Sequence, residues 1–180
     1  IPRKGKADHL MMIEDRNTNT TGAQLVGITN KRVGSKLSKI KKDIESGKVK
    51  TLIVFGEDVT KHGIDIKLLK KVTLIVSDIL PNNTTKAADF LLPGCAHAEK
   101  RGTFTNVKGR VQKFMKALDP PGDALPEWEF LHELAHNVTG LDGFKTIEGL
   151  FDKMAREVNA FKEAELTWAK LGDQGADVEL

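Results

Sequence analysis

Three short apolar runs separated by helix-like segments most constrain the fold of this chain. The runs are 52–55, 72–76 and 90–92, and each is continuously apolar, or nearly so, rather than alternating with polar residues. Such runs are typical of strands that are covered on both faces, as in a parallel sheet. Amphipathic segments at 37–45 and 64–69 predict helices between the runs, and alternating strands and helices predict βαβ units. We therefore expect an α/β fold with a largely parallel open sheet and one edge hairpin.

The rest of the chain divides at a Pro- and Gly-rich connector at residues 116–126. Before it, we expect a further strand at 9–13 and helical turns at 23–27 and 84–88. After it, amphipathic patterns predict helices at 127–137, 146–157 and 164–170, and a tail that frays from Gly172. The sequence thus predicts an α/β domain over 1–118, followed over 119–180 by the connector and a helical annex.

Charge is distributed unevenly between these two parts. Residues 1–118 hold 23 basic and 11 acidic side chains, a net charge of +12, whereas residues 119–180 have a net charge of −9. A basic half suits phosphate groups or an acidic partner subunit. It is equally typical of the solvated face of an amphipathic helix, since many of the lysines surround Leu37, Ile40 and Ile44.

The chain begins with Ile-Pro rather than Met, and we expect it to be a piece of a longer polypeptide. It contains no apolar run of signal-peptide or membrane length, so we expect no direct membrane insertion. One cysteine, Cys95, excludes a disulfide framework and a self-contained iron–sulfur cluster, which takes four thiolates. We expect Cys95 to be a small buried residue.

The segment that follows the third apolar run is rich in hydrogen-bond donors. It reads Glu-Lys-Arg-Gly-Thr-Phe-Thr-Asn at 99–106 and Gly-Arg-Val-Gln at 109–112. Loops of this composition at strand ends often carry function, and Gly102 and Gly109 would let the backbone approach a ligand closely. The alternative is a twisted connection with polar tips.

Carboxylates also follow the first two predicted strands. Gly56-Glu57-Asp58 comes directly after the first strand, and Asp78 closely follows the second. Ligands of open α/β sheets bind beyond the carboxyl ends of the strands, where a carboxylate can accept hydrogen bonds from ribose hydroxyls or a guanine edge. An Asp at a strand end can equally be a helix N-cap.

The order of these residues resembles the molybdopterin oxidoreductase family. The resemblance runs from about Asn17 to the C-terminus. It is specific from Ala88 to Gln112 and looser elsewhere, including the stretches 17–23, 120–122 and 127–129. Within the family, the chain is most similar to the large iron–sulfur subunit of NADH–quinone oxidoreductase, with formate dehydrogenase large subunits next. The resemblance implies half of a molybdopterin-binding domain, whose loops surround the pterin, guanosine and diphosphate parts of the cofactor. The positions that it implies for cofactor binding are Gly56, Glu57, Asp78, Thr84, Glu99, Lys100, Gly102, Thr103, Thr105, Asn106 and Arg110.

Two departures from the family pattern bear on cofactor binding. The usual Gly-Glu-Asn-Pro ends here in Asp58-Val59, and the usual Thr-Glu-Thr is Asn82-Asn83-Thr84. Ionised Asp is an acceptor only, and close to a diphosphate it would repel the ligand. These departures favour the NADH–quinone oxidoreductase branch, in which the resemblance implies a pterin-type domain with an architectural role and no bound cofactor.

On this interpretation the fragment is not itself catalytic, and the iron–sulfur clusters and the metal-ligand position lie upstream in the parent chain. Its partners would be the upstream domains and other subunits of a respiratory complex, at the cytoplasmic face of the inner membrane. The alternative is the molybdopterin guanine dinucleotide-binding part of an active oxidoreductase such as formate dehydrogenase.

Two other functions are less favoured by the residues. His132-Glu133-Leu134-Ala135-His136 matches the H-E-x-x-H pattern of zinc hydrolases, and Asp142 stands where a third ligand could fall. The apolar residues Trp128, Leu131, Leu134 and Val138 instead favour a helix that packs on a core. Nucleic-acid binding is disfavoured, because the chain has no Tyr and its Phe residues lie in apolar runs.

Overall fold

The computed structural model describes residues 4–7, 15–29, 36–140 and 143–180. The chain forms two compact units that interleave along the sequence. The parallel-sheet unit comprises 35–100 and 116–143, and the hairpin unit comprises 1–34, 101–115 and 144–180. The predicted strand at 9–13 lies outside the described residues. The predicted division into residues 1–118 and 119–180 stays a prediction.

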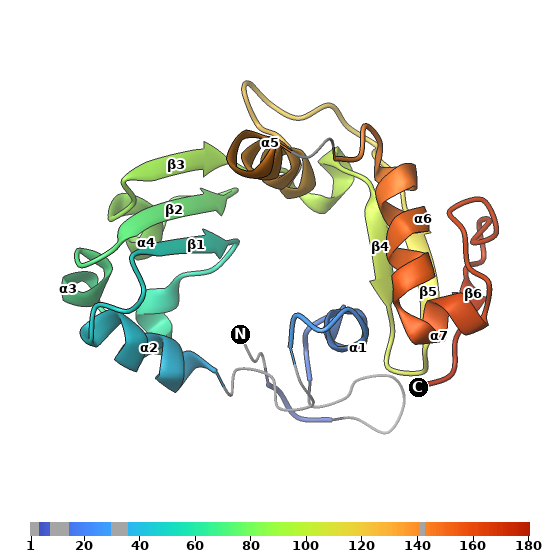
Figure 1. Ribbon diagram of the computed structural model, residues 1–180, viewed down its shortest axis with the longest axis horizontal. Coiled ribbons are helices and arrows are strands. Elements are labelled where there is room, and N and C mark those ends of the chain that lie inside the picture. The colour runs from blue at the N-terminus through green and yellow to red at the C-terminus, as the bar shows by residue number, and fades with distance from the viewer. Residues whose placement is uncertain (1–3, 8–14, 30–35, 141–142) are drawn as a thin grey trace. The chain divides into compact units, whose positions relative to one another are not determined.

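A three-stranded parallel sheet organises the parallel-sheet unit. Strands β1 (Thr51–Phe55), β2 (Thr73–Asp78) and β3 (Phe90–Pro93) pair in the order β1-β2-β3 (Figure 1). Leu52 lies opposite Leu74, and Ile75 lies opposite Phe90. The parallel arrangement predicted from the three apolar runs, and with it the α/β fold, is confirmed. All three strands end at one edge of the sheet, because parallel strands run in the same direction.

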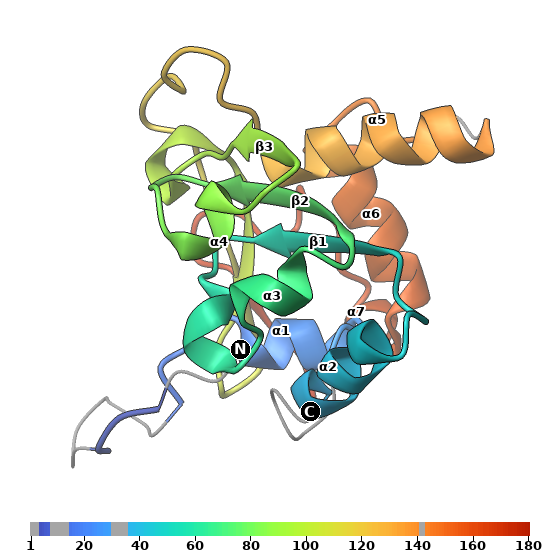
Figure 2. The same cartoon turned by 90° about the vertical axis from the view of Figure 1, so that its left-hand side faces the viewer.

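Short helices connect these strands. Helix α2 (Leu37–Glu45) ends before Gly47, whose φ is 72°, and helix α3 (Ile66–Leu69) contacts α2. The other connections are the 3-10 helix η1 (Val59–His62) and helix α4 (Asn83–Lys86). Both α2 and α3 direct apolar side chains inward, since Ile44 and Leu69 are buried. Figure 2 shows α2 and α3 on the same side of the unit.

Strand β3 is not covered on both faces. Phe90 is 59% exposed and Leu91 is 57% exposed. Because neighbouring residues of a strand point to opposite faces, both faces of β3 are exposed here. Beyond β3, Gly94 forms a parallel bridge with Leu125, and the 3-10 helix η2 (His97–Glu99) follows. The expectation that each apolar run is covered on both faces is therefore wrong for β3.

Helix α5 (Glu127–Thr139) completes the parallel-sheet unit. None of its residues is buried, and Leu131 and Val138 are exposed. The expectation that its apolar stripe packs on a core is therefore wrong for these two residues. Within the described part of the chain, no helix is both long enough and apolar enough to cross a membrane.

The hairpin unit is built on an antiparallel sheet separate from the parallel one. Strands β4 (Gly102–Thr105) and β5 (Arg110–Phe114) form a hairpin, and β6 (Ala176–Asp177) pairs with β5. The predicted hairpin is thus present, but it does not belong to the edge of the parallel sheet. Helices α1 (Thr20–Leu25), α6 (Ile147–Glu157) and α7 (Asn159–Glu163) belong to the same unit.

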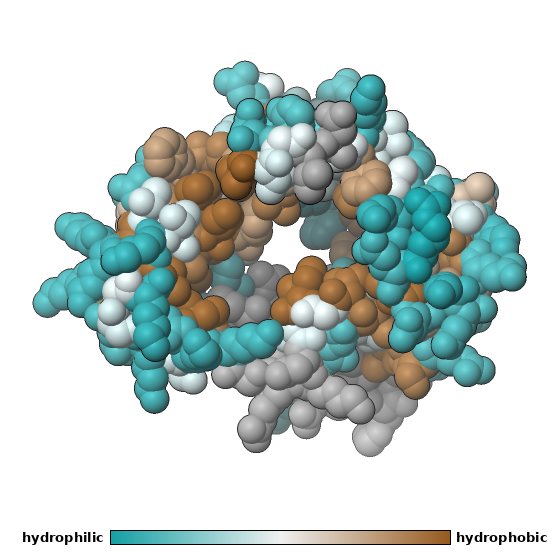
Figure 3. Space-filling model, in the orientation of Figure 1, coloured by the Kyte–Doolittle hydropathy of each residue, from teal (hydrophilic) through white to brown (hydrophobic). Residues whose placement is uncertain are grey.

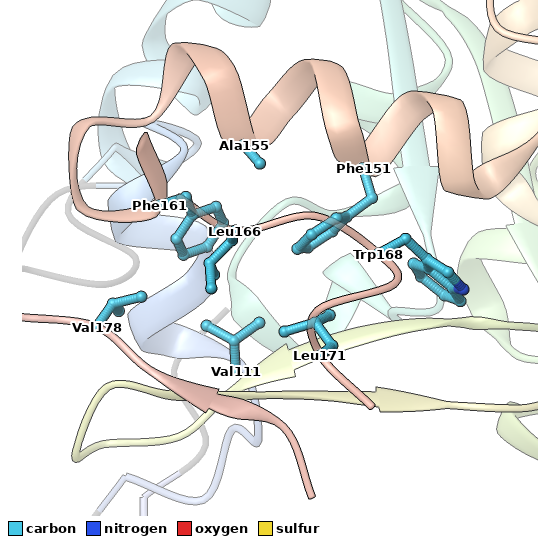
Figure 4. Close-up of a cluster of buried hydrophobic side chains, with 8 residues drawn as sticks. All are labelled: Val111, Phe151, Ala155, Phe161, Leu166, Trp168, Leu171 and Val178. Carbon is cyan, nitrogen blue, oxygen red and sulfur yellow. The ribbon is translucent and has the colours of Figure 1, made fainter. Parts of the chain in front are cut away.

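Aromatic side chains fill the core of the hairpin unit (Figure 4). The ring centroids of Phe151 and Trp168 are 5.9 Å apart in an edge-on arrangement, and those of Phe151 and Phe161 are 6.1 Å apart. Val111 of strand β5 is also buried in this cluster. Burial of these large side chains is the main stabilising contribution available to the unit.

Two expectations about the C-terminal region are wrong. Residues 164–170 do not form an α-helix, because α7 ends at Glu163 and Glu165 has a φ of 47°, which a helix cannot accommodate. The tail does not fray either. Val178 is buried and donates its N–H to the Gly109 carbonyl at 3.0 Å, so long-range pairing with the hairpin holds the tail.

Candidate functional site

The predicted site residues divide between the two units, and each group is described by itself. Gly56, Glu57, Asp78 and Thr84 surround the carboxyl ends of β1 and β2, with Glu99 and Lys100 further along the same unit. The other group belongs to the hairpin and its flanks in the hairpin unit, and it comprises Gly102, Thr103, Thr105, Asn106 and Arg110.

The loop after β1 is fixed to the neighbouring strand. Gly56 has a φ of 59°, in the left-handed region that favours glycine, and its N–H donates to the Ser77 carbonyl at 2.8 Å. The next side chain, Glu57, accepts the Asp58 N–H at 3.2 Å and lies 3.5 Å from Nε2 of His62. Gly56 is exposed, so its backbone is open to a ligand at the strand ends.

Asp58 turns into the protein rather than toward the strand-end surface. It is 6% exposed and caps η1. Its Oδ1 accepts the Thr60 hydroxyl at 2.7 Å, the Thr84 hydroxyl at 3.0 Å and the Thr60 N–H at 3.3 Å. The hydrogen bond from the Thr60 side chain is the largest effect on the pKa of Asp58, which lies below its usual value. The carboxylate that replaces the family's Asn therefore stays ionised and is held by internal donors.

Thr84 joins the loops that follow β1 and β2. Its hydroxyl donates to Asp58 and accepts the Val59 N–H at 3.0 Å, and the residue is 0% exposed. A fully buried side chain cannot touch a ligand at the surface. Thr84 therefore acts by positioning the β1 loop through Asp58.

Asp78 organises the turn after β2. Its Oδ1 accepts the N–H groups of Ile79 at 2.7 Å and Leu80 at 3.4 Å, and its Oδ2 accepts Nδ2 of Asn82 at 2.8 Å. Asp78 is half-buried, so part of the carboxylate surface faces solvent while these donors fix its orientation. A carboxylate held in this way is a directed acceptor for further donors.

The second departure from the family pattern forms a complete helix cap. The side chain of Asn82 accepts the N–H groups of Thr84 at 2.9 Å and Thr85 at 3.0 Å. In return, the Thr85 hydroxyl accepts the Asn82 N–H at 2.8 Å, which completes a capping box at the start of α4. The Asn82-Asn83-Thr84 sequence thus supports the same loop that holds Asp78.

The loop after β3 lies tightly against the end of β2. The Gly94 N–H donates to the Asp78 carbonyl at 3.1 Å, and a β-carbon at this position would stand 2.9 Å from Oγ of Ser77. Cys95 is 2% exposed, and burial raises the pKa of its thiol. The expectation of a small buried residue is confirmed.

The charged residues that follow are paired within the protein. Glu99 accepts the Ala96 N–H at 2.8 Å, and Nζ of Lys100 contacts both carboxylate oxygens of Glu127, at 2.9 and 2.7 Å. In the hairpin unit, the Arg101 guanidinium pairs with Glu148. A hydrogen bond from the backbone N–H of Glu148 itself, together with Arg101, lowers the pKa of the Glu148 carboxyl. An anionic ligand would have to compete with these carboxylates for both cations.

The hairpin residues make the internal hydrogen bonds that a turn requires. Oδ1 of Asn106 accepts the N–H groups of Lys108 at 2.8 Å and Arg110 at 3.1 Å, and so stabilises the turn between β4 and β5. The side chain of Arg110 pairs with an acidic neighbour. Its guanidinium donates to Asp177 at 3.0 and 3.1 Å and to the Gln174 carbonyl at 2.9 and 3.1 Å.

The other hairpin candidates lie in strand β4. Thr105 is buried, and its N–H donates to Oδ1 of Asn19 at 2.8 Å. Thr103 is half-buried and lies opposite Lys113. A β-carbon on Gly102 would stand 2.8 Å from the Phe114 ring, which explains the glycine without a ligand.

The H-E-x-x-H residues lie on helix α5. His132 is half-buried, whereas Glu133 and His136 are exposed. Asp142 lies outside the described residues. Among the residues that the structure does describe, no group of three or more His, Cys, Asp or Glu side chains is placed to hold a metal ion.

Sequence reasoning missed the partners that hold this site together. The link from Asp58 to Thr84 spans 26 residues, and no local pattern signals it. The role of Thr60 could have been found, because Asp-x-Thr is a common N-cap arrangement. The pairing of Lys100 with Glu127 had no signal beyond opposite charge.

The chain is similar in sequence to several known proteins. Residues 5–137 match the molybdopterin oxidoreductase family. The chain is 37% identical over 134 residues to the alpha subunit of F420-dependent formate dehydrogenase 2 of Methanococcus maripaludis, covering 71% of the chain and 20% of that subunit. It is 35% identical over 133 residues to the alpha subunit of the NADPH-Fe(3+) oxidoreductase of Geobacter sulfurreducens, covering 71% and 16%.

A solved structure also shares the fold. Acetylene hydratase from Pelobacter acetylenicus superposes with a TM-score of 0.59 at 18% identity, covering 79% of this chain and 21% of that one. The chain spans about a fifth or less of the curated relatives described above.

Proposed function

The chain belongs to the molybdopterin oxidoreductase family, and on this premise we propose that it is part of the catalytic subunit of a formate dehydrogenase-type oxidoreductase. In this proposal its strand-end loops hold the nucleotide end of a molybdopterin guanine dinucleotide cofactor. Several relatives are formate dehydrogenase alpha subunits, which favours this function over the NADH–quinone oxidoreductase subunit expected from the sequence.

The orientation of Asp58 carries the proposal. From the sequence, a carboxylate in place of the family's Asn was expected to repel a diphosphate. Asp58 is instead buried, and its Oδ1 accepts hydrogen bonds from the hydroxyls of Thr60 and Thr84, so internal donors already occupy this oxygen. This internal pairing supports the proposal, because it weakens the repulsion that the sequence led us to expect between Asp58 and a diphosphate.

The remaining strand-end groups fit a nucleoside. The exposed backbone of Gly56 and the oriented carboxylate of Asp78 would hold it, while Asn82 keeps Asp78 in place. Lys100 would have to leave Glu127 in order to neutralise an anionic arm. When bound, the cofactor supplies the redox chemistry. This chain binds and orients it, and other parts of the longer polypeptide would supply the metal ligand and the iron–sulfur clusters.

Titration calorimetry of the chain with guanosine diphosphate tests the proposal. We expect saturable binding with a Kd at or below about 100 μM, equivalent to about 5.5 kcal/mol, and weaker binding of adenosine diphosphate. Absence of heat at about millimolar guanosine diphosphate would contradict it.

A matched pair of variants locates the site. Asp78→Asn removes the charge at the carboxyl ends of the strands, and we expect binding to weaken about tenfold. Asp89→Asn is the control, because the Asp89 carboxylate also accepts a backbone N–H, that of Leu74 at 2.8 Å, but at the opposite end of β2. Equal losses in both variants would argue against a site at the strand ends.

A further inference from the structure

Helices α2 and α3 carry a cluster of exposed lysines whose role the cofactor proposal does not explain. We call this cluster the lysine face. It consists of the exposed residues Lys36, Lys39, Lys42, Lys48, Lys50, Lys67, Lys70 and Lys71. We propose that the lysine face is a docking surface for an acidic protein that associates transiently through electrostatic attraction.

The fold brings two separate lysine clusters together. Helix α2 with the residues that flank it on both sides carries five of these lysines, and α3 with its C-terminal flank carries three. The two helices contact each other and lie on the same side of the unit (Figures 1 and 2). Figure 3 shows hydrophilic side chains gathered over this region. Three apolar residues of the helices, Ile44, Leu68 and Leu69, are buried, and Leu37 and Ile40 are half-buried. Ile66 is 37% exposed, and the lysines make up most of the remaining outer surface.

Little acidic charge offsets these lysines. Segments 36–50 and 65–71 contain nine lysines and three acidic residues, a net charge of +6. Of the acids, Asp43 pairs with Lys39, and Asp65 is occupied by capping α3. Within the described residues, the other lysines of the face have no acidic side chain within ion-pair distance. Such a concentration of like charge raises the rate at which an oppositely charged partner arrives.

The composition of the face favours a protein partner over a nucleic acid or a membrane. Segments 36–50 and 65–71 contain no arginine, the residue that binds phosphate bidentately, and no aromatic residue that could stack on a base. Membrane anchoring needs an exposed apolar helix face, whereas Ile44, Leu68 and Leu69 are buried and Ile66 is only 37% exposed.

The same composition predicts a transient contact. Lysine is depleted from the buried centres of permanent interfaces, where aromatic residues and arginine are enriched. The charges of a face dominated by lysine would stay hydrated in the complex. They would speed association with the partner but would not slow its dissociation. The complex should therefore form quickly and weaken steeply with salt.

Binding of a fluorescent 20-residue polyglutamate peptide to the full 180-residue chain at about 50 mM salt tests the proposal. The face variant is Lys36→Glu, Lys42→Glu, Lys48→Glu and Lys70→Glu. Its matched control changes the net charge equally at four exposed lysines elsewhere: Lys86→Glu, Lys108→Glu, Lys145→Glu and Lys162→Glu.

We expect the face variant to bind the peptide at least tenfold more weakly and with a shallower salt dependence, whereas the control loses less than threefold. Circular dichroism must show both variants folded. Equal losses in the two variants would mean that net charge alone attracts the probe, and no loss in the face variant would exclude the face. A DNA duplex of equal charge that binds tenfold more tightly than the peptide, through the same lysines, would assign the face to nucleic acid. Preferential binding to anionic vesicles would assign it to a membrane. Either result would overturn the proposal.

Discussion

Replacing Thr84 with valine would test the buried link that holds the two strand-end loops together. Valine has nearly the same shape as threonine but has no hydroxyl. The change removes the donor to Oδ1 of Asp58 at 3.0 Å and the acceptor for the Val59 N–H at 3.0 Å. Because Thr84 is fully buried, water cannot readily replace it.

The expected loss of stability follows from these two contacts. A hydrogen bond to a charged group contributes about 1.5–3 kcal/mol, and a buried donor left without a partner costs about 1–3 kcal/mol. Asp58 keeps both donors of Thr60, which reduces the first effect. We therefore expect Thr84→Val to lower the free energy of unfolding by about 3 kcal/mol, and the Tm by roughly 6–12 °C.

Urea denaturation followed by tryptophan fluorescence measures this loss, with Trp128 reporting on the parallel-sheet unit and Trp168 on the hairpin unit. Hydrogen exchange at the Val59 amide should accelerate in the variant. Thr84→Ser keeps the hydroxyl and should recover most of the stability. Thr73→Val, at an exposed strand position, should stay within about 0.5 kcal/mol of the original chain. A loss below about 0.5 kcal/mol in Thr84→Val, or an equal loss in Thr84→Ser, would refute the reasoning.

Three further predictions concern acid, the thiol and the tail. The pKa of Asp58 is lowered in the folded state, so its contribution to stability is complete above the usual Asp pKa and is lost as pH falls through the folded pKa; Asp58→Asn should flatten the acid limb of a stability profile. Cys95 is buried with a raised thiol pKa, so a thiol reagent at pH 8 should label it at least a hundredfold faster in denaturant than in the native chain. Gly175 has a φ of 78°, and an added methyl group would meet a strand carbonyl and a neighbouring side chain. Gly175→Ala should therefore destabilise by more than about 2 kcal/mol by urea denaturation, against about 1 kcal/mol for Gly172→Ala, where φ is also positive but space is open.

The parallel sheet could be predicted because its signals are local. Each apolar run is bounded by turn residues or helix signals, and Gly47 and Asp65 mark a helix end and a helix start. The C-terminal region could not be predicted in this way. The N–H of Trp168 donates to Oδ1 of Asp152 at 2.7 Å, a contact that competes with the helical pattern of 164–170. Helical periodicity carries no information about such a partner 16 residues away.

In the candidate site, too, local sequence patterns did not reveal contacts between residues far apart in the chain. The position of Asp78 at the end of β2 was predictable, because residues that follow an apolar run occupy a strand end. The burial of Asp58 was not predictable, since it depends on Thr84 in a different loop. Repulsion between Asp58 and a diphosphate could therefore be judged only once the direction of the carboxylate was known.

The central proposal, in which this chain is part of a longer catalytic subunit, is tested most directly by analysing the nucleotide that acid releases from that purified subunit. Chromatography of the released material identifies the base and measures its amount per polypeptide. We predict about one guanine nucleotide per chain, and a large loss of it in the Asp78→Asn variant with Asp89→Asn unaffected. Active, folded protein that releases no guanine nucleotide would contradict the assignment of the strand-end loops to a guanine dinucleotide cofactor.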